Sequence, residues 1–178
     1  MSKDAIVLTG LKETLKALGD FDKDAVKAFT KVINKELSSV KKEAQGFVES
    51  APPLSGWATQ PARKPRSRGG AGWPAWDQSI IKAGISTTKS EGKVRKDYTT
   101  SAGAIKNKSA AGVIYELSGR STSGNGTFIK NLEGQVGTAS RLIWKAVDKN
   151  KTKIEQNVYD ALAKAKTTLQ KNLEKETM

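Results

Sequence analysis

The pattern of apolar and polar positions predicts a long amphipathic helix in the N-terminal third of the chain, from about Asp22 to Ser50. Its apolar residues recur every three or four positions, at Val26, Phe29, Ile33, Leu37, Val40, Ala44 and Phe47. This spacing places them on one face of a helix over about six turns. Asp22 can cap the beginning, and the Pro52-Pro53 pair ends the helix because proline cannot continue its hydrogen bonds. We expect Val26, Phe29, Ile33, Leu37, Val40 and Phe47 to form a core or a subunit contact.

A second helical pattern covers the C-terminal part of the chain, beginning near Thr138 or Ser140, either of which can cap it. Its apolar positions are Ile143, Val147, Ile154, Val158, Leu162, Ala165, Leu169 and Leu173. The polar segment 149–151 interrupts the pattern, so one helix and two helices joined by a bend both remain open. A short helix is also predicted over Leu11–Leu18, with Gly19 as its C-terminal stop.

Between Gln78 and Leu117 the pattern changes to that of strands. Ile81, Ala83 and Ile85 alternate with polar or small residues, which is the period of a half-buried strand. A turn at 90–92 precedes a second, polar strand over 94–102, and residues 111–117 form a third, apolar strand. We therefore expect an antiparallel meander of three or four strands. The fold class is α+β, with a long N-terminal amphipathic helix and a C-terminal helix packed on a small antiparallel sheet with long loops, all in one domain over residues 1–178.

Two segments read as loops. Residues 51–76 hold all five prolines and three of the four tryptophans, together with four cations and no acid, so this segment is a basic Pro/Trp-rich loop insertion. Its distinctive side chains are Trp57, Arg63, Lys64, Arg66, Arg68, Trp73 and Trp76. Residues 118–136 are rich in Gly and Ser and are expected to form a flexible loop.

Charge is distributed unevenly along the chain. The 31 Lys and Arg exceed the 18 Asp and Glu by 13, and residues 51–140 account for a net +8 of that excess. A positive potential favours an anionic partner. For the basic loop three interpretations are open: cations and indoles on nucleic acid, docking on an acidic protein, or tryptophans that cover the protein's own core. Docking is the favoured hypothesis, through the seven side chains named above.

Candidate chemistry is sparse. The chain contains no Cys and no His, which removes disulfides, thiolate nucleophiles, Cys-based zinc sites and the commonest general base. Glu116 is expected to face water from its strand, and the glycines of 119–126 lack the Gly-Lys-Ser/Thr of a phosphate loop. We therefore predict no catalytic residue, no cofactor site and no metal site. No apolar run is long enough for a secretory signal or a membrane span, so we expect a protein made in the cytoplasm.

Five short motifs, in this order, resemble a known family. They are LTGLKETL at 8–15, APPLSG at 51–56, WDQSI at 76–80, VIYELSG at 113–119 and SRLIWKA at 140–146. Their order and junctions resemble those of the neck or tail-completion proteins of long-tailed bacteriophages, a family of head–tail joining and minor tail proteins. In that family a strand begins soon after the Ser-Gly, whereas here about twenty residues intervene. The function of the inserted loop is therefore not part of the resemblance.

The resemblance implies a structural function. Such proteins form a ring, commonly of six subunits, between the head-closure proteins and the tail-terminator or tail-tube proteins, and DNA passes through it. It thus implies a virion protein with homo-oligomeric contacts, protein neighbours and non-specific contact with DNA. Three alternatives remain: a tail-terminator protein that caps the tail tube, a basic nucleic-acid-binding protein outside phage biology, and an enzyme, for which no site is assembled. Salt separates DNA binding from protein docking, because sequence-independent DNA binding weakens steeply as salt rises.

Overall fold

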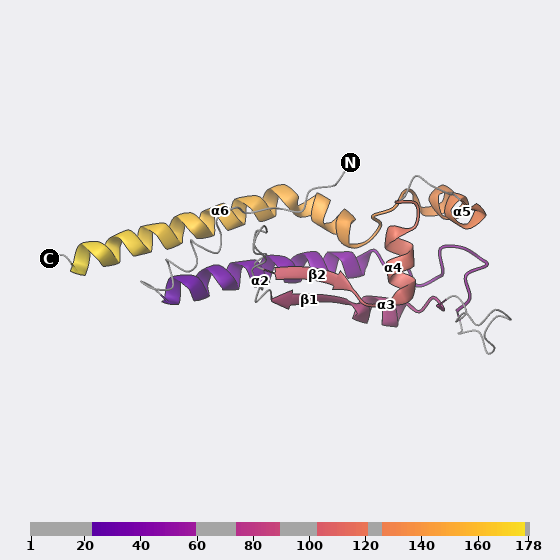
Figure 1. The fold of residues 1–178 in the computed structure, drawn as a ribbon, viewed down its shortest axis with the longest axis horizontal. Coiled ribbons are helices and arrows are strands. Elements are labelled where there is room, and N and C mark those ends of the chain that lie inside the picture. Colours follow the sequence, from indigo (N-terminus) through magenta and orange to yellow (C-terminus); the bar gives the residue numbers. More distant parts are fainter. Residues whose placement is uncertain (1–22, 60–73, 90–102, 121–125, 177–178) are drawn as a thin grey trace, which may run out of the picture. The chain divides into compact units, whose positions relative to one another are not determined.

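The computed structural model describes residues 23–59, 74–89, 103–120 and 126–176 (Figure 1). These residues form five helices and a two-stranded antiparallel sheet, so the α+β class is confirmed. The sequence pattern predicts one domain. The structure divides the chain between two compact units, the first made of residues 1–39, 87–104 and 149–178 and the second of residues 40–86 and 105–148. The short helix expected over Leu11–Leu18 lies outside the described residues.

The first long helix, α2, spans Lys23–Gly46 and confirms the helix predicted from Asp22 to Ser50. On its stripe Phe29, Val40 and Ala44 are buried, whereas Ile33 and Leu37 are half-buried. Phe47, just beyond the helix, is also half-buried, and the side chain of Val26 lies outside the described residues. In the first unit Phe29 packs against Val158, and the half-buried residues around this pair are Ile33, Ile154, Ala161 and Leu162. This cluster is the apolar centre of the first unit.

The second long helix, α6, spans Ile143–Glu176 as one continuous helix, so the polar segment 149–151 does not divide it into two helices. It also begins later than predicted. Ser140 has a positive φ of 76°, whereas a residue that caps a helix N-terminus has an extended backbone. Of the stripe residues, Val158 and Ala165 are buried, and Ile143, Val147, Ile154 and Leu162 are half-buried. The side chains of Leu169 and Leu173 lie outside those described.

The strand predicted around Ile81 is a helix. The structure places α3 over Gln78–Gly84 and starts strand β1 only at Ile85–Lys89. Asp77 caps α3, because its Oδ1 accepts from the backbone N–H of Ser79 at 2.8 Å and of Ile80 at 3.1 Å. Ala83, which completed the alternating pattern, is exposed, whereas Ile81 and Ile85 are fully buried. Ile81 lies in α3 and Ile85 begins β1, so their burial does not follow the alternation of a single strand.

The strand predicted over 111–117 is also a helix, α4, spanning Ala110–Leu117. Ser109 caps it, with its Oγ accepting from the N–H of Gly112 at 3.3 Å. Helices α3 and α4 pack closely, as Figure 1 shows. Glycine is required at this contact, because a Cβ on Gly84 would lie 2.8 Å from the backbone nitrogen of Ser109. Because Ser109 caps a helix N-terminus, the apolar segment that follows it forms a helix and not a strand.

The sheet is smaller than predicted among the described residues. Strand β2, Gly103–Asn107, pairs with β1 to form a two-stranded sheet (Figure 1). The turn expected at 90–92 and the strand expected over 94–102 lie outside the described residues. The meander of three or four strands is therefore not found, since α3 and α4 occupy two of the segments assigned to it.

A helix also occupies the second predicted loop. Within 118–136 the structure contains α5, spanning Thr127–Val136, with Leu132 fully buried and Phe128 and Ile129 half-buried. Gly137 ends α5 in a backbone conformation with a positive φ of 83°, which glycine adopts without strain. The loop prediction weighed the Gly and Ser content and overlooked the helical spacing of these apolar residues.

Candidate interaction site

The two described ends of the basic segment 51–76 are fastened to each other in the second unit. The indole Nε1 of Trp57 donates to the carbonyl of Pro74 at 2.9 Å, and the backbone N–H of Trp76 donates to the carbonyl of Ala58 at 2.7 Å. The indole Nε1 of Trp76 donates to the carbonyl of Glu49 at 3.2 Å. Hydrogen bonds therefore join residues 57–58 to residues 74–76, and we call this junction the loop base.

The tryptophans at this base belong to a buried aromatic cluster. Trp57 and Trp76 are 5% and 3% exposed, and their rings meet edge to face at a centroid distance of 5.2 Å. Trp57 also contacts Phe128 at 5.5 Å, and Trp76 contacts Tyr115 at 5.2 Å, both edge to face. Such pairs stabilise by about 0.5–1.5 kcal/mol beyond their buried area. The cluster thus joins the loop base to α4 and α5.

This burial corrects the assignment of two predicted docking residues. Trp57 and Trp76 cover the protein's own core, which was one of the three interpretations of the loop, and neither presents an indole to a partner. The other docking residues, Arg63, Lys64, Arg66, Arg68 and Trp73, lie outside the described residues.

Glu116 is buried, contrary to the prediction that it faces water, and it caps a helix distant in sequence. It is 5% exposed, and its two carboxylate oxygens accept from the backbone N–H groups of Leu142 and Trp144, the latter at 3.0 Å. The Trp144 amide lies in the first turn of α6 and the Leu142 amide immediately precedes the helix, where N–H groups have no partner within the helix. A negative charge there also interacts favourably with the helix dipole.

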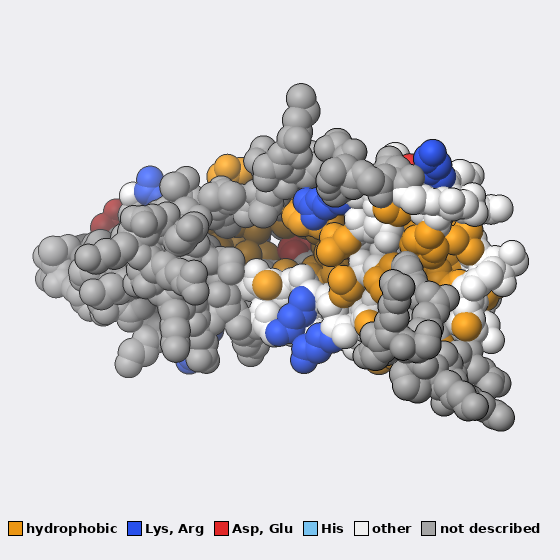
Figure 2. All heavy atoms as spheres, turned by 45° about the vertical axis from the view of Figure 1, so that its right-hand side comes forward, with side chains coloured by type: hydrophobic (Ala, Val, Ile, Leu, Met, Phe, Trp, Pro, Cys, Tyr) orange, Lys and Arg blue, Asp and Glu red, His pale blue; other side chains and the backbone are white. Residues whose placement is uncertain are grey.

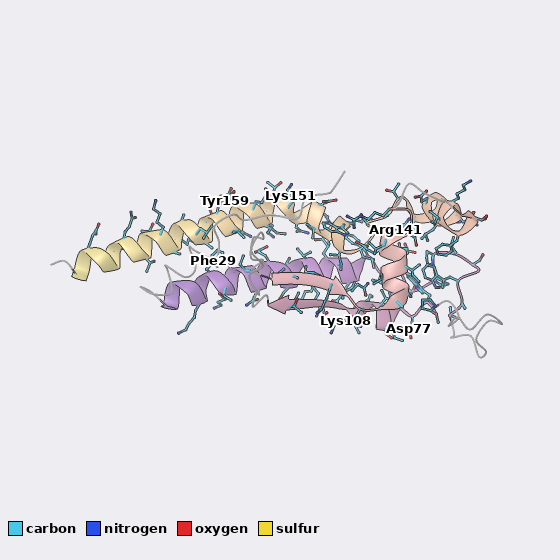
Figure 3. The ribbon with its side chains drawn as sticks, in the orientation of Figure 1. Phe29, Asp77, Lys108, Arg141, Lys151 and Tyr159 are labelled. Atoms are coloured by element: carbon cyan, nitrogen blue, oxygen red, sulfur yellow. The ribbon has the colours of Figure 1, made fainter. Side chains whose placement is uncertain are left out.

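Arg141 performs the reciprocal function for α4. It is 4% exposed, and its Nη1 donates to the carbonyls of Tyr115 at 2.6 Å and Ser118 at 3.0 Å (Figure 3). Its Nε and Nη2 both donate to the carbonyl of Gly137, at 2.9 and 2.7 Å. A cation at the C-terminal end of α4 matches the unpaired carbonyls and the dipole of that end. We call Glu116 and Arg141, with the backbone groups they bind, the capping cluster.

Burial changes the pKa of Arg141 and of Tyr115. It lowers the pKa of Arg141, and the charges of Tyr115, Glu133 and Glu116 oppose that change. Burial also raises the pKa of Tyr115, reinforced by the charge of Glu49. The Tyr115 ring lies 5.5 Å from the guanidinium carbon of Arg141, within the range of a cation–π contact. The chemistry of the cluster is therefore the fixing of two helix ends by charged hydrogen bonds.

Within residues 23–59, 74–89, 103–120 and 126–176, no three acidic, His or Cys side chains gather in a way that could hold a metal ion. None of the described helices combines the length and the apolar content needed to cross a membrane.

Apolar and basic side chains share the described surface of the second unit (Figure 2). Ile80 on α3 is 61% exposed and Leu117 on α4 is 42% exposed. In the first unit, Tyr159 on α6 is 61% exposed. These large exposed side chains were not among the predicted site residues, because the patterns that contain Ile80 and Leu117 were assigned to strands.

Comparison with protein-family models, with curated proteins and with solved structures found no match to this chain.

Proposed function

We propose that this chain is a structural virion protein of the head–tail interface of a long-tailed bacteriophage. In this proposal it forms a ring, commonly of six copies, that joins the head-closure proteins to the tail-terminator or tail-tube proteins and lets DNA pass. The protein is made in the host cytoplasm and acts in the particle, without a cofactor or a catalytic step. The proposal rests on the motif resemblance and on the position of two of those motifs in the fold.

The observation that carries the proposal is the capping cluster. The motifs at 113–119 and 140–146 are separate in sequence, and their charged residues bind each other's backbone groups: Glu116 accepts from Leu142 and Trp144, and Arg141 donates to Tyr115 and Ser118. Residues brought together in this way act as one unit, which supports treating the two motifs as one signature. Their function there is to hold helices in place, as a structural protein requires.

The loop base gives the second support. The cations Arg63, Lys64, Arg66 and Arg68 lie between two ends that Trp57 and Trp76 fasten to the second unit. A basic segment anchored in this way is suited to contact acidic protein neighbours of the ring. Many such contacts around a ring add by multivalency, so each single loop can bind weakly.

Electron microscopy of a lysate in which this gene is inactivated tests the proposal. We expect DNA-filled heads beside detached, finished tails. Overlong tails would replace the proposal with a tail-terminator function. Normally joined particles would overturn both. In that case the positive charge would point to a nucleic-acid-binding protein, whose affinity for duplex DNA would fall steeply between low and moderate salt.

A further inference from the structure

Helix α4 has two different faces. One carries the buried residues Ala111, Gly112, Tyr115 and Glu116. The other carries Ala110, Val113, Ile114 and Leu117, which share one side of the helix because they are spaced three and four positions apart. The outer side of a surface helix normally carries polar and charged residues, and here all four residues are apolar. We call these four residues the α4 face.

The α4 face is accessible at both of its ends. Leu117 is 42% exposed and Ala110 is exposed, whereas Val113 and Ile114 between them are half-buried. The single acid of α4, Glu116, points inward and is bound to the backbone of α6. The outer side of this helix therefore offers apolar contact with no negative charge of its own.

Cations precede and follow α4 in the chain. Lys108, labelled in Figure 3, precedes the helix and is exposed. Arg120 follows the helix and is exposed, and its guanidinium carbon lies 5.2 Å from the centroid of the Trp144 ring. Lys82 lies in the last turn of α3, the helix that packs against α4. An apolar strip with cations near both ends matches a partner whose apolar residues are bordered by acids.

We infer that the α4 face binds an amphipathic helix of an acidic partner protein. Such a helix would place its own apolar residues, at spacings of three and four, on Val113, Ile114 and Leu117, with acidic residues beside Lys108 and Arg120. A second copy of this chain fits less well, because both copies carry a net charge of +13 and the same flanking cations. The inference rests on described residues alone and stands whether or not the chain belongs to a phage particle.

A designed peptide tests this inference on the full-length protein. The probe is a fluorescently labelled helix of about 18 residues, since shorter helices are marginal in water, with Leu at the apolar spacing and Glu elsewhere. A matched peptide carries Lys in place of every Glu. We expect the fluorescence anisotropy of the acidic peptide to rise when the protein is added, because the peptide binds. The anisotropy of the basic peptide should stay unchanged.

Substitutions then locate the binding. Leu117→Asp and the uncharged Leu117→Ser should weaken the acidic peptide about tenfold or more, which corresponds to about 1.4 kcal/mol. Lys108→Glu combined with Arg120→Glu should weaken the acidic peptide and permit the basic one to bind. Tyr159→Ser is the matched control, because it removes an exposed aromatic residue from the other unit and should change nothing.

Three results would overturn the inference. The first is that both peptides bind equally well, or that neither peptide binds. The second is a loss in Tyr159→Ser as large as that in Leu117→Ser. The third comes from sedimentation: if the wild-type protein is oligomeric and Leu117→Ser is monomeric with an unchanged melting temperature, the α4 face binds a second copy instead.

Discussion

Glu116 shows how much structure one side chain can determine in this protein. Its carboxylate binds the first turn of α6, and its backbone carbonyl accepts from the N–H of Ser140 at 2.7 Å. We predict that Glu116→Gln lowers the free energy of unfolding by about 1–3 kcal/mol, because an amide has one acceptor oxygen where the carboxylate has two, and a buried N–H group loses its partner. Urea denaturation followed by circular dichroism measures the change.

The control for this prediction is Glu49→Gln. Glu49 is exposed, and the carbonyl through which it binds Trp76 is unaffected by the substitution. It should stay within about 0.5 kcal/mol of the wild type. If Glu116→Gln unfolds at the same urea concentration as the wild type, Glu116 does not cap α6.

Asp77 gives the protein a dependence on acidic pH. The hydrogen bond from the Ser79 hydroxyl, and then that from the N–H of Ile80, hold the pKa of Asp77 below its ordinary value of 3.8. Since the folded state has the lower pKa, its stabilisation is present above the unfolded value and is lost as pH falls through the folded value. Asp77→Ser keeps a capping oxygen without this titration. We predict that, as the pH falls below 3.8, the wild type loses free energy of unfolding relative to Asp77→Ser.

Unfolding in urea at neutral pH and at several acidic values measures this difference. Substitution of the neighbouring exposed residue, Ile80→Ser, should leave the pH profile parallel to that of the wild type. A stability difference between wild type and Asp77→Ser that stays constant through the acidic range would contradict the prediction.

Single residues also show which parts of the site were predictable. The stripe residues Phe29 and Val40 were predicted as core candidates from spacing alone, and they are buried. Glu116 was not, because its partner Leu142 is 26 positions away and no local pattern signals such a contact. Trp57 and Trp76 were recognised as distinctive, but composition cannot distinguish an indole that covers the core from one that awaits a partner.

At the scale of elements, the long helices were predictable and the short ones were not. The apolar positions of α2 repeat over many turns, so only the helical period fits them. A short apolar run fits a strand and a helix equally well. The signals that decide α3 and α4 are their caps, Asp77 and Ser109, each followed by backbone N–H groups that it accepts from. Asp77 and Ser109 precede the two apolar segments, but the strand predictions depended on the alternation of apolar residues and on apolar composition.

Helix α5 provides a prediction at this scale. Gly134 lies inside the helix, is exposed, and has open space around the position of a Cβ. We predict that Gly134→Ala raises the free energy of unfolding by about 0.5–1 kcal/mol, because alanine restricts the unfolded chain and favours the helix. Urea denaturation measures the gain, provided that α5 unfolds together with the rest of the second unit.

Gly84→Ala is the matched comparison, with the same change in the opposite environment. Its Cβ would lie 2.8 Å from the backbone nitrogen of Ser109, which cannot move without disturbing α4. This variant should be destabilised. If both variants shift in the same direction, the packing of α3 on α4 is looser than described.

At the scale of the whole molecule, the class was predictable and the details of the sheet were not. The structure contains the two predicted amphipathic helices and a sheet, but its strands lie at Ile85–Lys89 and Gly103–Asn107 rather than around Ile81 and over 111–117. The division into two compact units was not predictable, because each long helix belongs to both and no composition change marks the boundary. Net charge, in contrast, is a property of the whole sequence, and a net +8 of the total +13 lies in residues 51–140.

The basic segment carries the last prediction, since it links charge to the proposed function. We predict that replacing its four cations by alanine, in the variant R63A/K64A/R66A/R68A, leaves the melting temperature unchanged. The anchoring contacts belong to Trp57 and Trp76 rather than to the cations. The same variant should fail to join heads to tails, because it removes the charges proposed to contact acidic neighbours. Thermal melting measures the first effect, and electron microscopy of a complemented lysate counts joined particles for the second.

A second charge variant separates position from total charge. The variant K151A/K153A/K164A/K166A removes an equal number of positive charges, four, from exposed positions on α6. Particles with this variant should join as those of the wild type do. If both variants fail equally, the net charge matters and the basic segment has no special function. If the loop variant melts early, the segment is part of the core. If it joins particles normally, the docking function is wrong, and the anchored base of Trp57 and Trp76 serves only to close a surface loop.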